Sequence, residues 1–105
     1  MKQSKLVGEL LREKREEQGL LLRQVSAKVN IDTAILSKIE RSARKASKEQ
    51  ILNLAEILNL NKEDILVQYL SEKILNEIKG EELGEKALKV AKQKIKSINK
   101  NYSEK

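Results

Sequence analysis

Residues 24–40, QVSAKVNIDTAILSKIE, have the pattern of two short helices joined by a tight turn. Val25 and Val29 are four residues apart, so they share one face of a first helix. Asn30 stands at the turn, because Asn adopts the left-handed conformation more readily than most residues. Asp32 is a suitable N-cap for a second helix. The stretch therefore predicts a helical hairpin.

The second helix of this hairpin should have an inner and an outer face. Ile35, Leu36 and Ile39 recur at helical spacing, and we expect them to face the core. The small residues Ser26 and Ala27 of the first helix should allow the second to approach closely. Short or basic side chains are left on the outer face, where they could lie against a groove: Thr33, Ala34, Ser37 and Lys38.

Helical patterns precede and follow the hairpin. The preceding helix should run from about Ser4, its N-cap, to Gln18, with Gly19 ending it. The next helix begins at a capping box formed by Ser47 and Gln50. Its inner face is Ile51, Leu54, Ala55 and Leu58. A fifth helix opens at residues 61–64 and continues to about Lys79, where Gly80 stops it.

The order of these segments resembles the Cro/CI-type (Xre-like) helix-turn-helix DNA-binding family. The similarity rests on VGELLREKREEQGL at the start, on the turn and KIER in the middle, and on ILNLAEILNLNKEDIL at the end. It implies an all-α fold, a five-helix Cro/CI (lambda repressor-like) domain over residues 6–66. The helix-turn-helix motif would occupy about residues 21–40. Residues 67–105 would form a helical C-terminal extension.

The resemblance also implies roles for individual residues. The second helix of the motif, about Asp32 to Glu40, would be the recognition helix, with Thr33, Ala34, Ser37 and Lys38 facing the bases. Arg15 would pair with Glu40, because a carboxylate inside a small core needs a bidentate donor. That pair would be structural. The phosphate-contacting residues would be Arg23, Gln24, Arg41, Arg44 and Lys45. For the last three, an alternative is simple complementarity to the C-terminal dipole of the helix.

The sequence departs from the family pattern at three positions. The family usually has Ser or Thr at Leu21 as a helix cap, and Gln at Leu22 in contact with a phosphate. Both residues are apolar here, so we expect Arg23 or Gln24 to take over the backbone contact. The family commonly has Gly at Ser42, where the chain turns with positive φ. Since Ser is less suited to that conformation, we expect the chain to leave the helix by another route.

Composition excludes several functional classes. The chain has no Cys, which rules out disulfides and thiolate sites, and no His, the commonest metal ligand and general base. Adjacent carboxylates such as Glu16 and Glu17 point about 100° apart on a helix and do not converge. We therefore expect no enzyme activity, no metal and no cofactor, and no small-molecule ligand is evident from the sequence. No apolar run approaches the roughly 20 residues of a membrane span, and we expect a cytoplasmic protein.

The net charge of +6 is unevenly spread. Residues 1–45 hold eleven cations against six acids, residues 46–80 four against six, and residues 81–105 seven against four. The basic excess therefore falls on the helix-turn-helix part and on the tail, which fits a polyanionic partner. A solvated lysine-rich surface is the other explanation, and for the tail we favour it.

An apolar stripe extends beyond what one small domain needs. We expect it to bury itself in a homodimer, because so long an exposed stripe is a liability on a monomer. Its residues are Leu66, Leu70, Ile74, Ile78, Leu88, Ala91, Ile95 and Ile98. Alternatively, the tail folds back on its own domain, and the fifth helix alone makes the dimer.

These expectations combine into a sequence-specific regulator that binds double-stranded DNA as a homodimer on an inverted repeat. Small proteins of the family include phage-type repressors, controllers of restriction–modification operons and antitoxins, and the extended helices suit a self-associating controller. The rival is an antitoxin or interaction module that binds a partner protein through its C-terminal helices. The cations around the recognition helix favour DNA.

Overall fold

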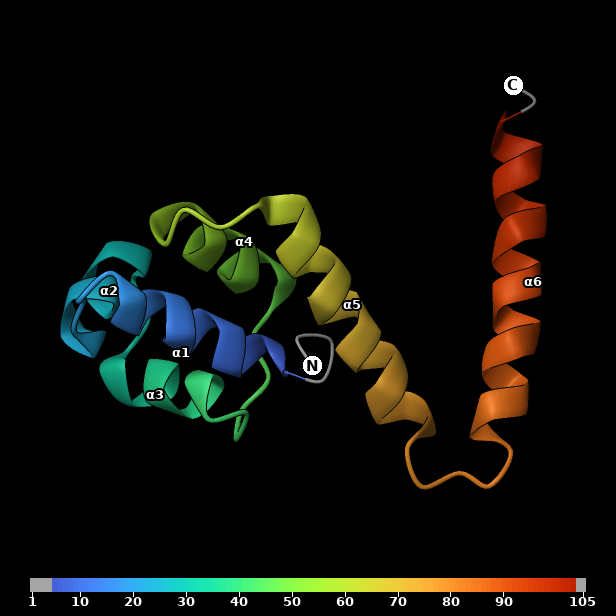
Figure 1. Cartoon of the computed structure of the whole chain (residues 1–105), viewed down its shortest axis with the longest axis horizontal. Helices are drawn as coiled ribbons and strands as arrows, with labels where there is room; N and C mark the ends of the chain where they lie inside the picture. Colours follow the sequence, from blue (N-terminus) through green and yellow to red (C-terminus); the bar gives the residue numbers. More distant parts are fainter. Residues whose placement is uncertain (1–4, 104–105) are drawn as a thin grey trace. The chain divides into compact units, whose positions relative to one another are not determined.

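The computed structural model describes residues 5–103, and within them every regular element is an α-helix. The predicted all-α class, five helices followed by a further helical segment, is confirmed (Figure 1). The helices are α1 (Val7–Glu17), α2 (Leu22–Val29), α3 (Thr33–Glu40), α4 (Lys48–Ile57), α5 (Lys62–Ile78) and α6 (Gly84–Ser103). None of them is both long and apolar enough to cross a membrane.

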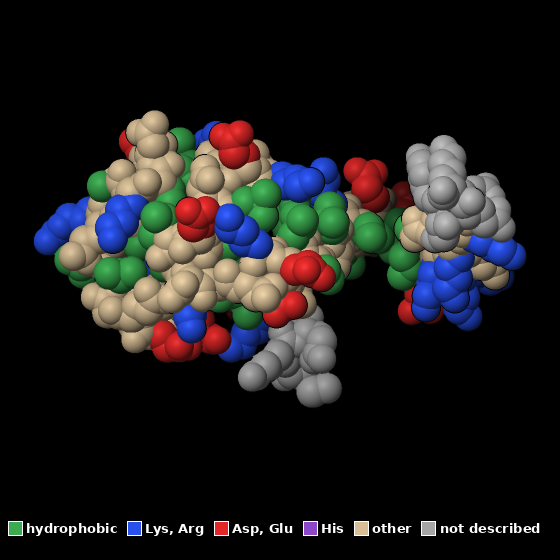
Figure 2. Space-filling model, turned by 90° about the horizontal axis from the view of Figure 1, so that it is seen from above, with side chains coloured by type: hydrophobic (Ala, Val, Ile, Leu, Met, Phe, Trp, Pro, Cys, Tyr) green, Lys and Arg blue, Asp and Glu red, His purple; other side chains and the backbone are tan. Residues whose placement is uncertain are grey.

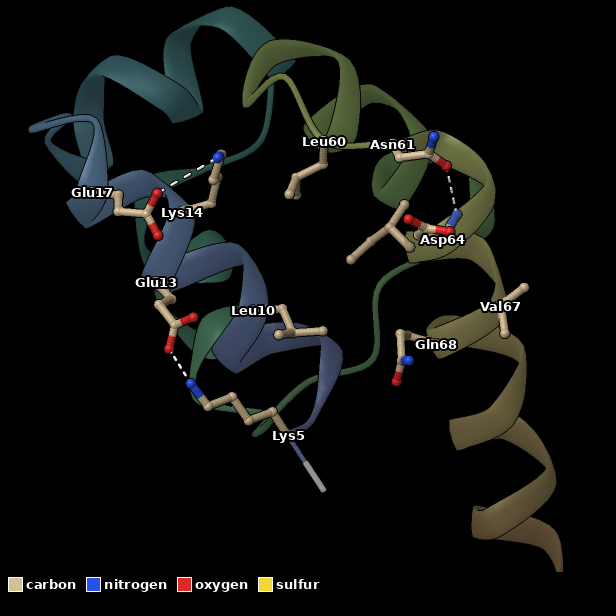
Figure 3. Close-up of a pocket in the computed structure, with 11 residues that line it drawn as sticks. Lys5, Leu10, Glu13, Lys14, Glu17, Leu60, Asn61, Asp64, Val67 and Gln68 are labelled. Atoms are coloured by element: carbon tan, nitrogen blue, oxygen red, sulfur yellow. Dashed lines mark hydrogen bonds and ion pairs between the residues drawn. The ribbon is translucent and has the colours of Figure 1, made fainter. Parts of the chain in front are cut away.

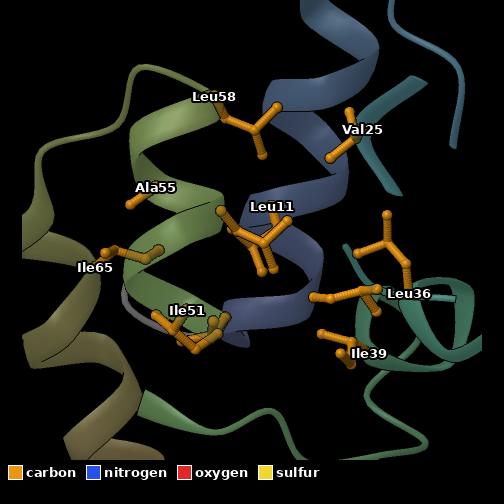
Figure 4. Close-up of a cluster of buried hydrophobic side chains, with 11 residues drawn as sticks. Leu11, Val25, Leu36, Ile39, Ile51, Ala55, Leu58 and Ile65 are labelled. Atoms are coloured by element: carbon orange, nitrogen blue, oxygen red, sulfur yellow. The ribbon is translucent and has the colours of Figure 1, made fainter. Parts of the chain in front are cut away.

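The N-terminal unit has an aliphatic core to which all of its helices or their connections contribute (Figure 4). Leu11, Leu36 and Leu54 are completely buried, and they come from α1, α3 and α4. The remaining core residues are Val7, Val25, Ile31, Ile39, Ile51, Ala55, Leu58 and Ile65. Leu36 and Ile39 are therefore buried as the helical spacing predicted, whereas Ile35 is half-buried against the same core.

The chain divides into two units within α5, between Lys73 and Ile74. The helix-turn-helix domain that the sequence predicts over residues 6–66 lies within the first of these units. The N-terminal unit extends further because α5 continues to contact it: Tyr69 packs against the core, and the Glu72 carboxylate accepts a hydrogen bond from the Val7 N–H at the start of α1. Partial burial raises the pKa of Glu72, the Glu9 charge adds to the rise, and that hydrogen bond opposes it.

The expected start of α1 is wrong. Ser4, the predicted N-cap, lies outside the described residues, but Leu6 is extended and helix begins only at Val7. Glu9 explains this start, because its carboxylate accepts a hydrogen bond from the Leu6 N–H at 2.8 Å. A carboxylate in the first turn satisfies a free backbone donor and also complements the helix dipole.

Gly8 sets the distance between α1 and α3. A Cβ atom at this position would lie 2.2 Å from the Ile39 carbonyl oxygen and 2.9 Å from that of Glu40. Both are backbone atoms near the end of α3, so a side chain cannot be accommodated by a change of rotamer. The glycine therefore fixes how closely the last turn of α3 packs against α1.

We expect Gly8→Ala to lower the free energy of unfolding by about 1–3 kcal/mol, because overpacking forces the two backbones apart. Helix propensity alone predicts the opposite sign, since Ala is favoured over Gly by about 1 kcal/mol in a helix. Urea unfolding followed by circular dichroism separates the two effects. A variant as stable as the parent, or more stable, would show that α1 and α3 are not in close backbone contact.

The second unit comprises the end of α5, a connection and α6. Gly80 ends α5 with a φ of 82°, as the sequence predicted for the stop after Lys79. Gly84 then begins α6 against the end of α5, where an added Cβ would lie 3.0 Å from the Ile78 carbonyl oxygen. Beyond this point the described side chains of α6 are exposed.

Candidate nucleic-acid interface

The turn between α2 and α3 has the geometry expected from its sequence. Asn30 adopts the left-handed conformation, with φ 56° and ψ 45°. The next residue, Ile31, is buried, and its N–H donates to the Ser26 carbonyl at 3.1 Å. Asp32 caps α3 by accepting a hydrogen bond from the Ala34 N–H at 2.8 Å. One positive-φ residue, one buried anchor and one cap therefore set the angle between the two helices.

A direct side-chain contact also joins the two helices. The Ser26 and Thr33 hydroxyl oxygens are 2.8 Å apart, and Ser26 is buried. Ser26 thus occupies the close-approach position for which its size suits it, whereas Ala27 is exposed. This hydrogen bond was not predicted from the sequence, since residues seven apart on different helices give no local signal. It directs the Thr33 hydroxyl toward α2.

The outer face of α3 carries the residues expected to face bases. Thr33, Ala34 and Lys38 are exposed, and Ser37 is half-buried. On the opposite side, Leu36 and Ile39 are buried in the core. The structure therefore gathers the four candidate base-contacting residues on one accessible helix face.

Exposed cations lie on α2 and after the end of α3. Arg23 lies in the first turn of α2, while Arg41, Arg44 and Lys45 follow the end of α3. All four side chains are exposed, and none forms an ion pair with a carboxylate of residues 5–103. Cations that neutralise no neighbouring acid are free to neutralise an anion from outside. Such exposed cations are the residue type that contacts phosphates in protein–DNA interfaces.

Gln24 has a structural task that the sequence reading did not assign to it. Leu21 occupies the N-cap position of α2 but offers no side-chain acceptor. The side-chain amide oxygen of Gln24, Oε1, instead accepts a hydrogen bond from the Leu21 N–H at 2.7 Å. This is the reciprocal half of a capping box, supplied from the third helical position. Only the amide nitrogen of Gln24 is left for a phosphate.

The backbone conformation after α3 differs from the one that the sequence predicted. Ser42 has a φ of 60°, so it adopts the left-handed conformation despite its side chain. The Ser42 N–H donates to the Ile39 carbonyl at 3.0 Å, and the Ala43 N–H donates to the Lys38 carbonyl at 2.8 Å. These two bonds form a Schellman motif, which satisfies carbonyls at the end of the helix and offsets the strain at Ser42.

Arg15 and Glu40 form a bidentate ion pair beneath this face. Arg15 Nε and Nη2 lie 2.7 and 3.0 Å from the two oxygens of Glu40, and Nη1 donates to the Leu20 carbonyl at 2.8 Å. Both residues are buried. The hydrogen bonds to Glu40 raise the pKa of Arg15, and burial opposes the rise. The pair joins α1, the α1–α2 loop and the end of α3, so it holds α3 in place.

A separate groove of about 580 Å³ is lined by α1, the α4–α5 connection and α5 (Figure 3). It contains none of the candidate DNA-contacting residues. Its floor includes Leu10 and Leu60, and Glu13 and Glu17 on its rim pair with Lys5 and Lys14. Across residues 5–103, no three Asp or Glu side chains come together in a way that could hold a metal ion.

Comparison with known proteins agrees with this geometry. A family model described as helix-turn-helix matches residues 11–65, more than half of the chain. The chain belongs to this helix-turn-helix family. It is a DNA-binding transcriptional regulator of the Cro/CI type and, like the members of that family, not an enzyme. No curated protein sequence matches the chain significantly.

Two solved structures share the fold at low sequence identity. The clp gene regulator ClgR from Corynebacterium glutamicum has a TM-score of 0.55 and 22% identity, over 88% of this chain and 84% of its own. The SinR protein/SinI protein complex has a TM-score of 0.54 and 18% identity, over 90% of this chain and 99% of the compared one. At these identities the similarity describes the fold.

Proposed function

We propose that this regulator is a homodimer that recognises an inverted repeat in double-stranded DNA by its base sequence. The observation that carries the proposal is the accessible face of α3, with unpaired cations at its C-terminal end and at the start of α2. The N-terminal half of α3 would enter the major groove. The cations would then hold phosphates and fix the register, while the α3 side chains would read base edges.

The α3 residues differ in what they can read. Lys38 can donate to guanine O6 or N7, and the methyl groups of Thr33 and Ala34 can contact a thymine methyl. Ser37 can hydrogen-bond to any base from its half-buried position. Asp32 could in principle accept from cytosine N4, but its carboxylate already caps α3. We therefore assign base reading to the other four residues.

The dimer is supported by apolar side chains that the described chain leaves uncovered. Leu70 and Ile74 on α5 are 46% and 45% exposed, although Ile65 and Tyr69 on another side of the same helix face the core. Val67, which is 59% exposed, belongs to this uncovered face and was not predicted. Burial against a second copy would place two recognition helices about 34 Å apart, one turn of the duplex.

Selection from a pool of random duplexes tests this function. We expect a palindromic consensus to emerge, because a two-fold dimer reads the same half-site twice. Binding to the selected duplex should weaken steeply as salt rises, with a slope of about −0.9 per neutralised phosphate. A pool that retains no consensus after repeated rounds, or equal affinity for selected and scrambled duplexes, would contradict sequence-specific binding.

Lys38→Ala and Arg44→Ala should change DNA binding in different ways. Loss of a base contact should cost about 1–3 kcal/mol and relax the preference at one base pair of each half-site. Loss of a phosphate contact should weaken all duplexes alike and lower the salt slope by about one per subunit. Both side chains are exposed, so neither change should affect stability. If the selected consensus were the same for Lys38→Ala as for the parent, Lys38 would not read a base.

The regulated genes distinguish the remaining possibilities. A compact, self-associating regulator suits control of a restriction–modification operon, and a neighbouring methyltransferase or endonuclease gene would support that role. A neighbouring toxin gene would instead favour an antitoxin that binds its partner through α5 and α6. That alternative has some support, since one of the similar structures is a complex between two different proteins. In each case we place the protein in the cytoplasm, with its DNA.

A further inference from the structure

The lysines of helix α6 lie mainly on one side of the helix. At 100° per residue, five of its six lysines fall within about a third of the circumference. This lysine face consists of Lys86, Lys89, Lys92, Lys96 and Lys100. The apolar positions Leu88, Ala91, Ile95 and Ile98 lie nearly opposite, and Lys94 lies apart, at the edge of the apolar stripe. Figure 2 shows lysine side chains gathered over the visible surface of α6.

The charges of α6 are not neutralised within the helix. It contains one acidic residue, Glu85, and none of its lysines forms an ion pair with a carboxylate of the described chain. Helix α1 of the same protein is built differently, since Arg12 pairs with Glu16 and Lys14 with Glu17. A surface helix that serves only solubility commonly mixes the two signs in this way.

The arrangement is unfavourable for the free helix. Lys92, Lys96 and Lys100 follow one another at spacings of four residues, and like charges at that spacing destabilise a helix by about 0.2–0.5 kcal/mol per pair. Lys86 also lies in the first turn, where the helix dipole disfavours a cation. An external polyanion would remove both penalties. A lysine-rich surface that is merely solvated does not require its lysines to lie on one side of the helix.

We propose that the lysine face of α6 binds phosphates of duplex DNA, as a sequence-independent contact in addition to that of α3. This inference rests on the proposed DNA-binding function. The face extends over about 21 Å, a length along which duplex DNA carries on the order of twelve phosphate charges. Lysine suits such a contact because its flexible stem carries a point charge that needs no fixed orientation.

An anionic membrane surface is the other partner that a basic amphipathic helix can bind. Two observations favour DNA. The chain contains no Trp and no Phe, the residues that usually anchor such a helix in a bilayer. The apolar stripe of α6 is also assigned to the dimer, which would leave only the lysine face for an external partner. Vesicle binding therefore becomes an outcome of the test.

The test measures binding of the full chain to a long duplex of mixed sequence, for which the operator need not be known. We expect the triple variant Lys89→Gln, Lys92→Gln, Lys96→Gln to reduce the magnitude of the salt slope by up to about three per subunit. Selected and mixed duplexes should weaken by the same factor, and the selected consensus should not change. Sedimentation should give the same oligomeric state, because the substitutions leave the apolar stripe intact.

Lys94 supplies the matched control. Lys94 and Lys96 flank Ile95 and carry the same charge, but they point about 160° apart around the helix. Lys96→Gln should therefore lower the salt slope by about 0.9 per subunit, whereas Lys94→Gln should leave it unchanged. Equal losses in the two variants would mean a diffuse effect of net charge and would overturn the proposal.

The remaining outcomes separate this inference from the proposed function. If the parent protein binds duplex DNA and the triple variant keeps its salt slope, the lysine face is not a DNA contact, although the function of α3 stands. If the triple variant loses binding to phosphatidylserine vesicles but not to duplex, the partner is a membrane and the proposal is wrong. If the parent binds no duplex at all, both proposals fail together.

Discussion

Glu40→Ala should lower the free energy of unfolding by about 3–5 kcal/mol, the usual cost of removing one partner of a buried ion pair. The substitution leaves the Arg15 guanidinium buried with one remaining hydrogen-bond acceptor, the Leu20 carbonyl. Small domains have a total stability of about 5–15 kcal/mol. Each kcal/mol shifts the melting temperature of a domain this size by about 4–8 °C, so we expect a drop of more than about 10 °C.

Glu16→Ala is the matched control for this change. Glu16 also faces Arg15, with an oxygen 4.0 Å from Nη2, but its side chain is 55% exposed and is shared with Arg12. Exposed ion pairs contribute about 0–1 kcal/mol, so this variant should melt close to the parent. Thermal unfolding by circular dichroism measures both. If the two variants melted at the same temperature, the Arg15–Glu40 pair would not be holding α3 in place.

The folded core could largely be predicted from the sequence, because its signals are local. Val25 and Val29, or Ile51 and Leu54, recur at helical spacing, and the capping box of Ser47 and Gln50 marks a helix start within four residues. Such patterns depend on neighbours along the chain. The outer face of α3 could be predicted from the same pattern, because it consists of the residues that do not lie on the apolar side.

Features that depend on tertiary contacts could not be predicted in this way. Ser42 was expected to avoid positive φ on intrinsic preference alone, but the two hydrogen bonds of the Schellman motif outweigh that preference. The Ser26–Thr33 hydrogen bond appears only when α2 and α3 have been packed. On α5 the sequence suggested a dimer stripe that begins at Leu66. In the structure the neighbouring Ile65 is buried in the core, whereas Leu70 and Ile74 remain exposed. This exposed side would be covered only in an assembly, so the sequence pattern of one chain does not identify the partner that covers it.

Removal of residues 81–105 should convert the proposed dimer into a monomer and lower operator affinity by about 10²–10⁴-fold. Two linked half-sites bind with that advantage because the second binding event is effectively intramolecular. The physical reason for dimerisation through the tail is the stripe on α6, where Leu88, Ile95 and Ile98 are 42%, 54% and 53% exposed. If α5 alone made the dimer, the truncated protein would still sediment as a dimer.

A point substitution tests the same stripe without shortening the chain. Ile95→Asp should dissociate the dimer, because it places a charge in the seam between the two copies. Val90→Asp is its control: Val90 is 47% exposed on the same helix but lies about 140° around it from Ile95. Both variants introduce Asp into the interior of α6 in place of a β-branched residue, so the intrinsic cost to the helix is similar at the two positions. Dissociation by Ile95→Asp alone would place the interface on the stripe. Equal behaviour of the two variants, whether both dimeric or both monomeric, would exclude the stripe as the specific dimer contact.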